Sequence, residues 1–144
     1  QQAMSLLDSQ EKMQINNVSG LYSVSPQISV TDLEFLSEKG FGKIICNRPD
    51  FEVPPSLQSN VIEKIATEMG LLFEYHPLTF ENMYAENIEK QLAFIEGSKS
   101  PVLAYCTSGT RSVAIWALGQ IGKMSKDEIL KTALESGYNL EGLL

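Results

Sequence analysis

The sequence has few of the residues from which metal centres and disulfide scaffolds are built. Its 144 residues include two cysteines, Cys46 and Cys106, and one histidine, His76. Two cysteines cannot form a disulfide framework, and a single histidine does not complete the four ligands of a structural zinc site. We therefore expect neither a metal nor a cofactor, so that any chemistry has to come from other side chains.

Positive charge and long apolar runs are also scarce. Lysine and arginine number 11 against 18 aspartates and glutamates, which gives a net charge of -7. Nucleic-acid binding needs a basic face, so we expect no such partner. The longest apolar run, 113–121, contains Gln120 and is too short to cross a membrane, so we expect no membrane partner. The sequence indicates no particular oligomeric state.

The start of the chain leaves its location open. It begins with Gln1 instead of methionine, and residues 1–17 are polar and have no clear packing partner. A removed signal peptide would place the protein in the periplasm, whereas a shortened chain would fit a cytoplasmic one. We expect residues 1–17 to form a flexible arm ahead of a domain that covers residues 18–144.

That domain alternates between short apolar segments and amphipathic ones. The predicted strands cover residues 20–24, 43–47, 71–78 and 101–105, and the predicted helices cover residues 31–40, 56–70, 85–96, 112–121 and 125–137. Strands that alternate with helices form parallel sheets through right-handed crossovers. The sequence therefore predicts one α/β domain, with a mainly parallel sheet of about four strands and helices on both faces.

One polar segment separates the last predicted strand from the helix after it. It reads Tyr105-Cys106-Thr107-Ser108-Gly109-Thr110-Arg111-Ser112. Ligands of open α/β sheets bind at the carboxyl ends of the strands. Backbone amides of residues 107–112 can converge there on an anion at the positive helix end, and Gly109 supplies the backbone freedom that this needs. The sequence therefore predicts an anion-binding loop.

The same loop carries the side chains of a catalytic site. We predict that Cys106 is a nucleophile, because the positive end of the helix favours its thiolate form. We predict that Arg111 is a bidentate anion clamp. Ser112 is predicted to hydrogen-bond the thiolate or to assist it as a leaving group. The amides of Thr107, Ser108, Gly109 and Thr110 are predicted to bind substrate. The alternative is a core cysteine in an ordinary turn. A cysteine, a glycine and an arginine at one junction favour the site.

A second polar loop, residues 48–52 (RPDFE), follows another predicted strand at the same edge of the sheet. Asp50 is a candidate acid or water-orienting base, and Arg48 is a candidate ligand for a substrate anion. The two could equally form a simple ion pair within the loop. Glu81 is a further candidate acid. Cys46 could resolve an oxidised Cys106 if their strands adjoin, but it is better explained as a small core residue.

The order C-x-x-G-x-R-S after a buried strand resembles that of dual-specificity phosphatases and of rhodanese sulfurtransferases. Over about residues 18–122 the chain is similar to the phosphatase-like domain of beta-lactamase-hydrolase-like proteins, a bacterial family. The similarity lies in GLYSVSPQ, CNRPDFE, YHPL and PVLAYCTSGTRS. It implies a protein-tyrosine-phosphatase-like fold, with Cys106 as nucleophile and Arg111 as anion clamp.

The loop departs from the phosphatase pattern in its length. Four residues separate Cys106 from Arg111, where phosphatases of this type have five and rhodaneses have four, and Tyr105 replaces the usual histidine. Three functions stay open. The resemblance favours a phosphatase that forms a thiophosphate on Cys106. The loop length favours a rhodanese-like sulfurtransferase that forms a persulfide there. The third is a non-catalytic anion-binding module. Each predicts a small anionic ligand such as a phosphoester, phosphate, sulfate or thiosulfate.

Overall fold

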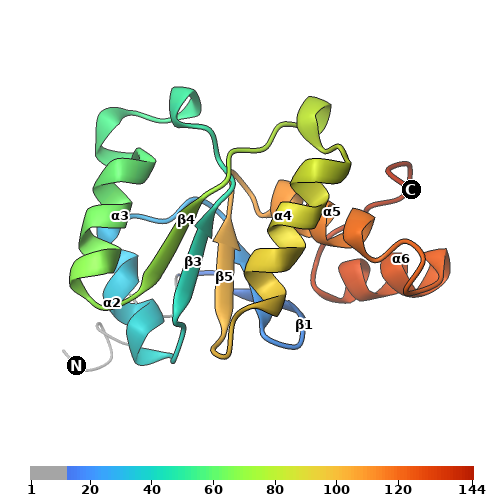
Figure 1. The fold of residues 1–144 in the computed structure, drawn as a ribbon, viewed down its shortest axis with the longest axis horizontal. Helices are drawn as coiled ribbons and strands as arrows, with labels where there is room; N and C mark the ends of the chain where they lie inside the picture. The colour runs from blue at the N-terminus through green and yellow to red at the C-terminus, as the bar shows by residue number, and fades with distance from the viewer. Residues whose placement is uncertain (1–12) are drawn as a thin grey trace, which may run out of the picture.

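The computed structural model describes residues 13–144, which fold around one five-stranded sheet (Figure 1). The strands are β1 (Asn16–Ser19), β2 (Tyr22–Ser25), β3 (Lys43–Cys46), β4 (Leu72–Tyr75) and β5 (Val102–Tyr105). Their order in the sheet is β1-β2-β5-β3-β4, with β1 antiparallel to β2 and the other neighbours parallel. The predicted α/β class is confirmed.

The start of the domain differs from the sequence prediction. One strand was predicted over residues 20–24, but the chain forms a hairpin of β1 and β2 that turns at Gly20, whose φ is 54°. Glycine adopts such a positive φ without the strain that a side chain would add. The domain therefore includes residues 16 and 17, which had been assigned to the arm. Residues 1–12 of that arm lie outside the described residues.

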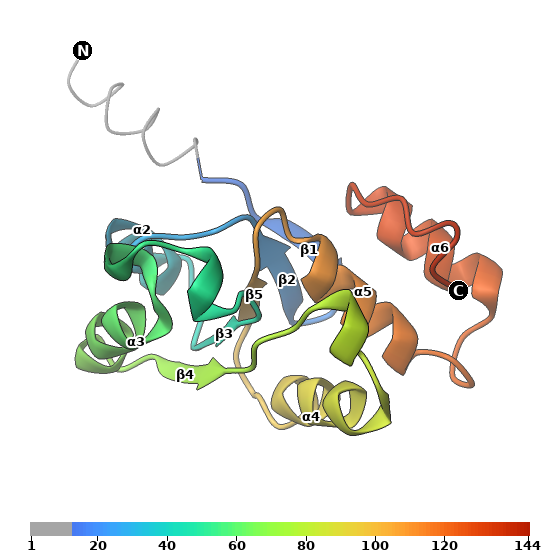
Figure 2. The same ribbon diagram turned by 90° about the horizontal axis from the view of Figure 1, so that it is seen from above.

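Helices cover both faces of the sheet, as predicted (Figure 2). The helices α2 (Val30–Glu38) and α3 (Ser59–Glu68) lie on one face. The helices α4 (Ala85–Glu96), α5 (Thr110–Gly119) and α6 (Lys126–Glu135) lie on the other. The spacing of Ser125 and Glu128 predicts a capping box at the start of α6, and it is present, since the Ser125 hydroxyl accepts from the Glu128 amide at 3.1 Å. For α2 the spacing of Thr31 and Glu34 predicts a capping box with Thr31 as N-cap, but Ser29 caps the helix, and the Ser29 amide donates to the Asp32 carboxylate at 2.9 Å.

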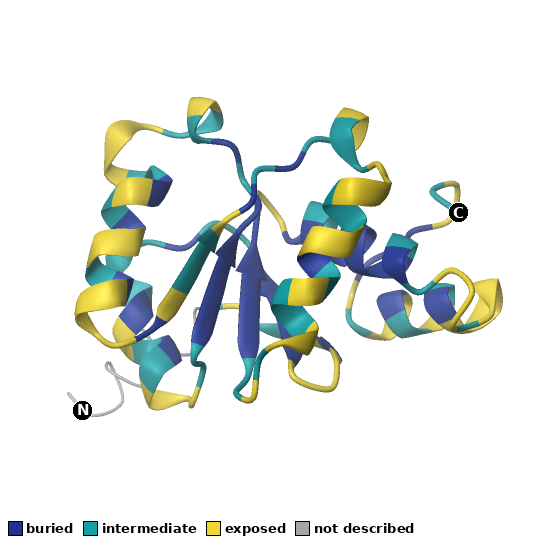
Figure 3. Cartoon of the chain, in the orientation of Figure 1, coloured by how far each residue is buried: buried dark blue, intermediate teal, exposed yellow. Residues whose placement is uncertain are grey.

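The central strands are buried on both sides (Figure 3). One apolar cluster lies between the sheet and α5 and α6, and a second lies between the sheet and α2 and α3. Three short 3-10 turns, η1 (Asp50–Glu52), η2 (Pro55–Leu57) and η3 (Phe80–Asn82), follow the carboxyl ends of β3 and β4. The packed sheet thus presents these turns and the cysteine loop at one edge.

Within residues 13–144, no helix is long and apolar enough to cross a membrane. In the same described part of the chain, no three histidine, cysteine, aspartate or glutamate side chains gather closely enough to hold a metal ion.

Candidate active site

The cysteine loop joins β5 to α5, as the sequence predicts. Cys106 follows the last residue of β5, and its side chain is only 1% exposed. The Gly109 amide donates to the Cys106 sulfur at 3.1 Å. α5 begins at the next residue, so the sulfur lies at the positive end of a buried helix. This arrangement favours the binding of an anion beside the sulfur.

The far side of the loop is fixed by residues that sequence reasoning missed. The hydroxyl of Tyr138, which follows α6, donates to the Ser108 carbonyl at 2.9 Å and accepts from the Asn16 side chain at 2.9 Å. Gly109 has a φ of 100°, and a Cβ atom there would overlap the Tyr138 hydroxyl. Glycine is therefore required both by the backbone conformation and by the close approach of Tyr138.

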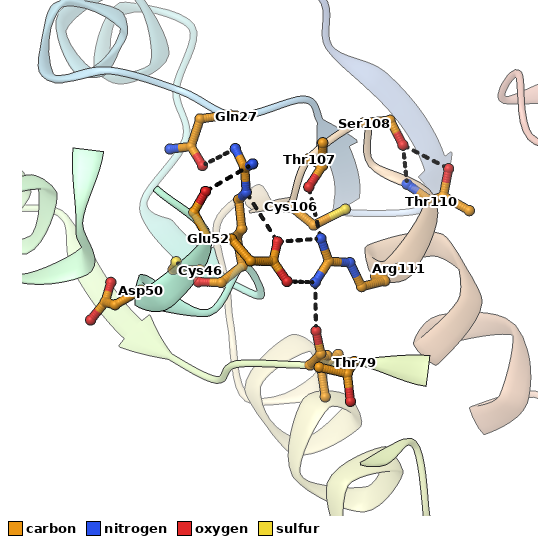
Figure 4. A network of polar contacts seen from close by, with 12 residues as sticks. Gln27, Cys46, Asp50, Glu52, Thr79, Cys106, Thr107, Ser108, Thr110 and Arg111 are labelled. Carbon is orange, nitrogen blue, oxygen red and sulfur yellow. Dashed lines mark hydrogen bonds and ion pairs between the residues drawn. The ribbon is translucent and has the colours of Figure 1, made fainter. Parts of the chain in front are cut away.

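Arg111 points back across the loop and is held by hydrogen bonds (Figure 4). Its Nη1 donates to Glu52 Oε2 at 2.9 Å and to the Leu78 carbonyl at 2.8 Å. Its Nη2 donates to Glu52 Oε1 at 2.8 Å and to the Thr107 hydroxyl at 2.7 Å. The structure therefore brings Arg111 to the cysteine loop as predicted, and adds Glu52 as its bidentate partner.

Glu52 lies between two arginines. Besides Arg111, Arg48 donates from Nε to Glu52 Oε1 at 3.2 Å and from Nη1 to the Gln27 side chain at 3.3 Å. Hydrogen bonds from Arg111, reinforced by the charges of both arginines, hold the pKa of Glu52 below its ordinary value. Arg48 therefore lies at the site, where its ion-pair partner is Glu52 and not Asp50.

Asp50 lies away from the cysteine loop. Its Oδ1 accepts from the Ser59 amide at 2.7 Å, and its Oδ2 accepts from the Ser59 hydroxyl at 2.9 Å. Both oxygens therefore accept hydrogen bonds from the first turn of α3, where the helix dipole favours a carboxylate. Asp50 therefore caps α3, and we do not propose it as the catalytic acid or base.

The two cysteines come from neighbouring strands, because Cys46 of β3 pairs with Tyr105 of β5. Both are free thiols. The Cys46 sulfur donates to the Arg48 carbonyl at 3.3 Å, and burial raises the pKa of Cys46 to about 11. A thiol that stays protonated at neutral pH is a poor nucleophile. This favours Cys46 as a core residue over Cys46 as a resolving cysteine.

Ser112 belongs to a buried network instead of facing the Cys106 sulfur. Its hydroxyl donates to the Asn47 side-chain oxygen at 2.8 Å, and its carbonyl accepts from the Tyr22 hydroxyl at 2.7 Å. Asn47 and Gln91 exchange two hydrogen bonds of 3.0 Å. A hydroxyl has one proton, so the Ser112 proton that Asn47 accepts is not available to a thiolate. The structure therefore supports a positioning role for Ser112.

An open hollow of about 340 Å³ lies beside Arg111. Its lining comes from η1, η3 and α5: Glu52, Thr79, Phe80, Glu81 and Arg111. Phe80 is half exposed, with 54% of its surface accessible.

A five-stranded α/β sheet with a cysteine-arginine loop at its carboxyl edge defines the class of protein-tyrosine-phosphatase-like domains, and the solved structures with the same fold agree. Within that class, the chain belongs to the family described as beta-lactamase hydrolase-like protein, phosphatase-like domain, which matches residues 14–123. The domain is therefore a phosphatase-like domain.

Relatives and solved structures show how widely this fold is shared. A phosphatase candidate from Neisseria meningitidis is 32% identical, with a TM-score of 0.81 over 90% of this chain and 93% of that one. One from Shewanella putrefaciens is 17% identical, with a TM-score of 0.70 over 95% of this chain and 90% of that one, and shares the fold.

Among curated relatives, the beta-lactamase hydrolase-like protein of Xylella fastidiosa is 25% identical over 89% of this chain. The chain spans 30% of the length of that relative.

Proposed function

We propose that the domain is a cysteine-dependent phosphatase that hydrolyses a small phosphomonoester. The Cys106 thiolate would attack phosphorus, forming an S–P bond while the P–O bond to the leaving group breaks. Water would then attack phosphorus, break the S–P bond and release inorganic phosphate. The observation that carries this proposal is the position of the Cys106 sulfur, between the Gly109 amide at the start of α5 and the Arg111 clamp.

We assign Glu81 as the acid that protonates the leaving oxygen. It lies in η3 and lines the hollow beside Arg111. The other two carboxylates considered are occupied, because Glu52 is bound by its arginines and Asp50 caps α3. Ser112 is assigned to hold the first turn of α5, and through it Arg111.

A rhodanese-like sulfurtransferase is the second candidate, and the geometry of the loop favours it. Four residues separate Cys106 from Arg111, and the terminal N–H groups of Arg111 are already bonded to protein oxygens. A single sulfur atom needs less room than a phosphoryl group. In this reaction the Cys106 thiolate would take the outer sulfur of thiosulfate, release sulfite, and pass that sulfur to a thiophilic acceptor.

The intact mass of the acid-quenched protein separates these chemistries. One sample is pulsed with an aryl phosphate and another with thiosulfate, and Cys106→Ser is the control. We expect a phosphoryl adduct that is absent from Cys106→Ser, and a loss of aryl phosphate turnover in that variant of roughly a thousandfold or more. A one-sulfur adduct would instead establish the sulfurtransferase. If neither adduct forms, the remaining candidate is a non-catalytic anion-binding module.

A further inference from the structure

The terminal nitrogens of Arg111 have no unused hydrogen. Nη1 donates to Glu52 and to the Leu78 carbonyl, and Nη2 donates to Glu52 and to the Thr107 hydroxyl, all within 2.9 Å. Each of these nitrogens carries two hydrogens, so the four bonds use all of them. An oxyanion that binds Arg111 through two N–H groups must therefore displace one of the existing partners.

The three partners differ in how firmly they are held. Glu52 is a charged acceptor with two bonds to Arg111 and a third from Arg48, and such charge-assisted bonds are about twice as strong as neutral ones. The Leu78 carbonyl belongs to a fully buried residue whose amide donates to the Asn47 carbonyl at 2.8 Å. Thr107 offers a neutral hydroxyl on an exposed side chain. Thr107 is therefore the partner that yields most easily.

Thr107 also lies on the side of Arg111 that faces the nucleophile. Its side chain follows directly after Cys106, and Figure 4 shows the Cys106 sulfur on the Thr107 side of the guanidinium. The Arg111 pKa is raised, first by the hydrogen bonds to Glu52 and also by the charge of Cys106. Glu52, in η1, lies on the other side of the guanidinium. An anion that reacts with Cys106 approaches from the Thr107 side.

We propose that the Thr107 hydroxyl occupies the place of one anion oxygen on Arg111, and that an incoming oxyanion displaces it while Glu52 stays bound. The anion then pairs with Nη2 and Nε, the two donors along that edge of the guanidinium. Thr107 thereby sets the affinity for oxyanions such as phosphate, sulfate and thiosulfate. The inference needs only the anion site of the proposed function and does not depend on which chemistry follows.

Isothermal titration of the whole chain with phosphate, and separately with thiosulfate, tests this at constant ionic strength. Thr107→Val keeps the side-chain shape and removes the hydroxyl that competes for Nη2. We expect it to lower the dissociation constant roughly threefold to tenfold, the effect of one neutral hydrogen bond. Thr107→Ser keeps the hydroxyl and should bind as the wild type does. Thr67→Val, on the exposed side of α3, is the matched control.

Two results for the affinity of Thr107→Val would contradict the inference. Weaker binding by Thr107→Val would make the hydroxyl a direct anion ligand, and unchanged binding would show that it is not displaced; either overturns the inference. Thr107→Ala replaces Thr107→Val if the latter unfolds. Failure of the phosphatase proposal is seen separately, as the lack of a phosphoryl adduct on Cys106.

Discussion

Glu52 shows how one side chain can set the geometry of a neighbouring cation. Its carboxylate accepts two hydrogen bonds from Arg111 and one from Arg48, while 24% of the side chain remains exposed. Arginine matches a carboxylate with two parallel hydrogen bonds, which fixes direction as well as distance. Glu52 thus orients Arg111 before any ligand arrives.

The lowered pKa of Glu52 predicts how stability depends on pH. Because the folded state binds this proton less tightly than the unfolded state, the contribution of Glu52 is complete above its ordinary pKa of 4.5 and is lost as the pH falls below that value. We expect urea unfolding at pH 7 to give a higher free energy for the wild type than for Glu52→Gln. The difference should shrink toward pH 3, and a constant difference would contradict the assignment.

The residues of the loop were predictable, but their partners were not. Cys106 and Arg111 stand out because their spacing and the flanking apolar runs can be read along the chain. Glu52 belongs to the same RPDFE segment as Asp50, and the sequence does not show which of them faces the loop. That choice depends on the turn η1 and on the start of α3, which takes up the Asp50 carboxylate.

At the scale of elements, one buried polar network joins four of them to the site. Ser112 of α5 donates to Asn47, which follows β3, and Asn47 bonds Gln91 of α4. His76, which follows β4, completes the chain, since its Nδ1 lies 2.7 Å from Gln91 Oε1. Gln91 is fully buried. Burying polar side chains is tolerated only when their hydrogen bonds are made, so the network ties α4 and α5 to the strand ends.

Replacing Gln91 tests how much this network contributes. Gln91→Met keeps the size of the side chain but leaves His76 Nδ1 and one Asn47 hydrogen without a partner. We expect a loss of about 2–4 kcal/mol in the free energy of unfolding, measured in urea. Gln120→Met, at a half-buried site with one long hydrogen bond of 3.4 Å, is the control. Equal losses in the two variants would rule out a special role for the network.

The elements themselves were largely predictable from sequence patterns. The apolar spacing within residues 85–96 predicted α4, and a capping box predicted the start of α6. The order of the strands in the sheet was not predictable. Nothing along the chain indicates that β5 lies between β2 and β3, or that β1 adds an antiparallel edge. Network residues such as Gln91 were missed for the same reason: a buried glutamine on a helix has no distinctive local pattern.

At the scale of the whole molecule, the two ends of the described chain meet at the cysteine loop. Asn16 of β1 and Tyr138 after α6 are 122 residues apart, and both belong to the hydrogen-bonded chain that reaches the Ser108 carbonyl. The family match ends at residue 123, so Tyr138 lies outside it. Tyr138, just after the final helix, therefore braces the loop from a part of the chain outside the family match.

Removing the Tyr138 hydroxyl tests this brace. Tyr138→Phe keeps the ring in the core but loses the bonds to Ser108 and Asn16, so we expect unfolding to cost about 1–2 kcal/mol less than in the wild type. Amide hydrogen exchange at Ser108 and Gly109 should become faster, because the carbonyl that held the turn has lost its donor. Tyr84→Phe, whose side chain is exposed, is the control. If both variants exchange at the same rate, the loop holds its shape without Tyr138, and the anion site depends on α5 and Arg111 alone.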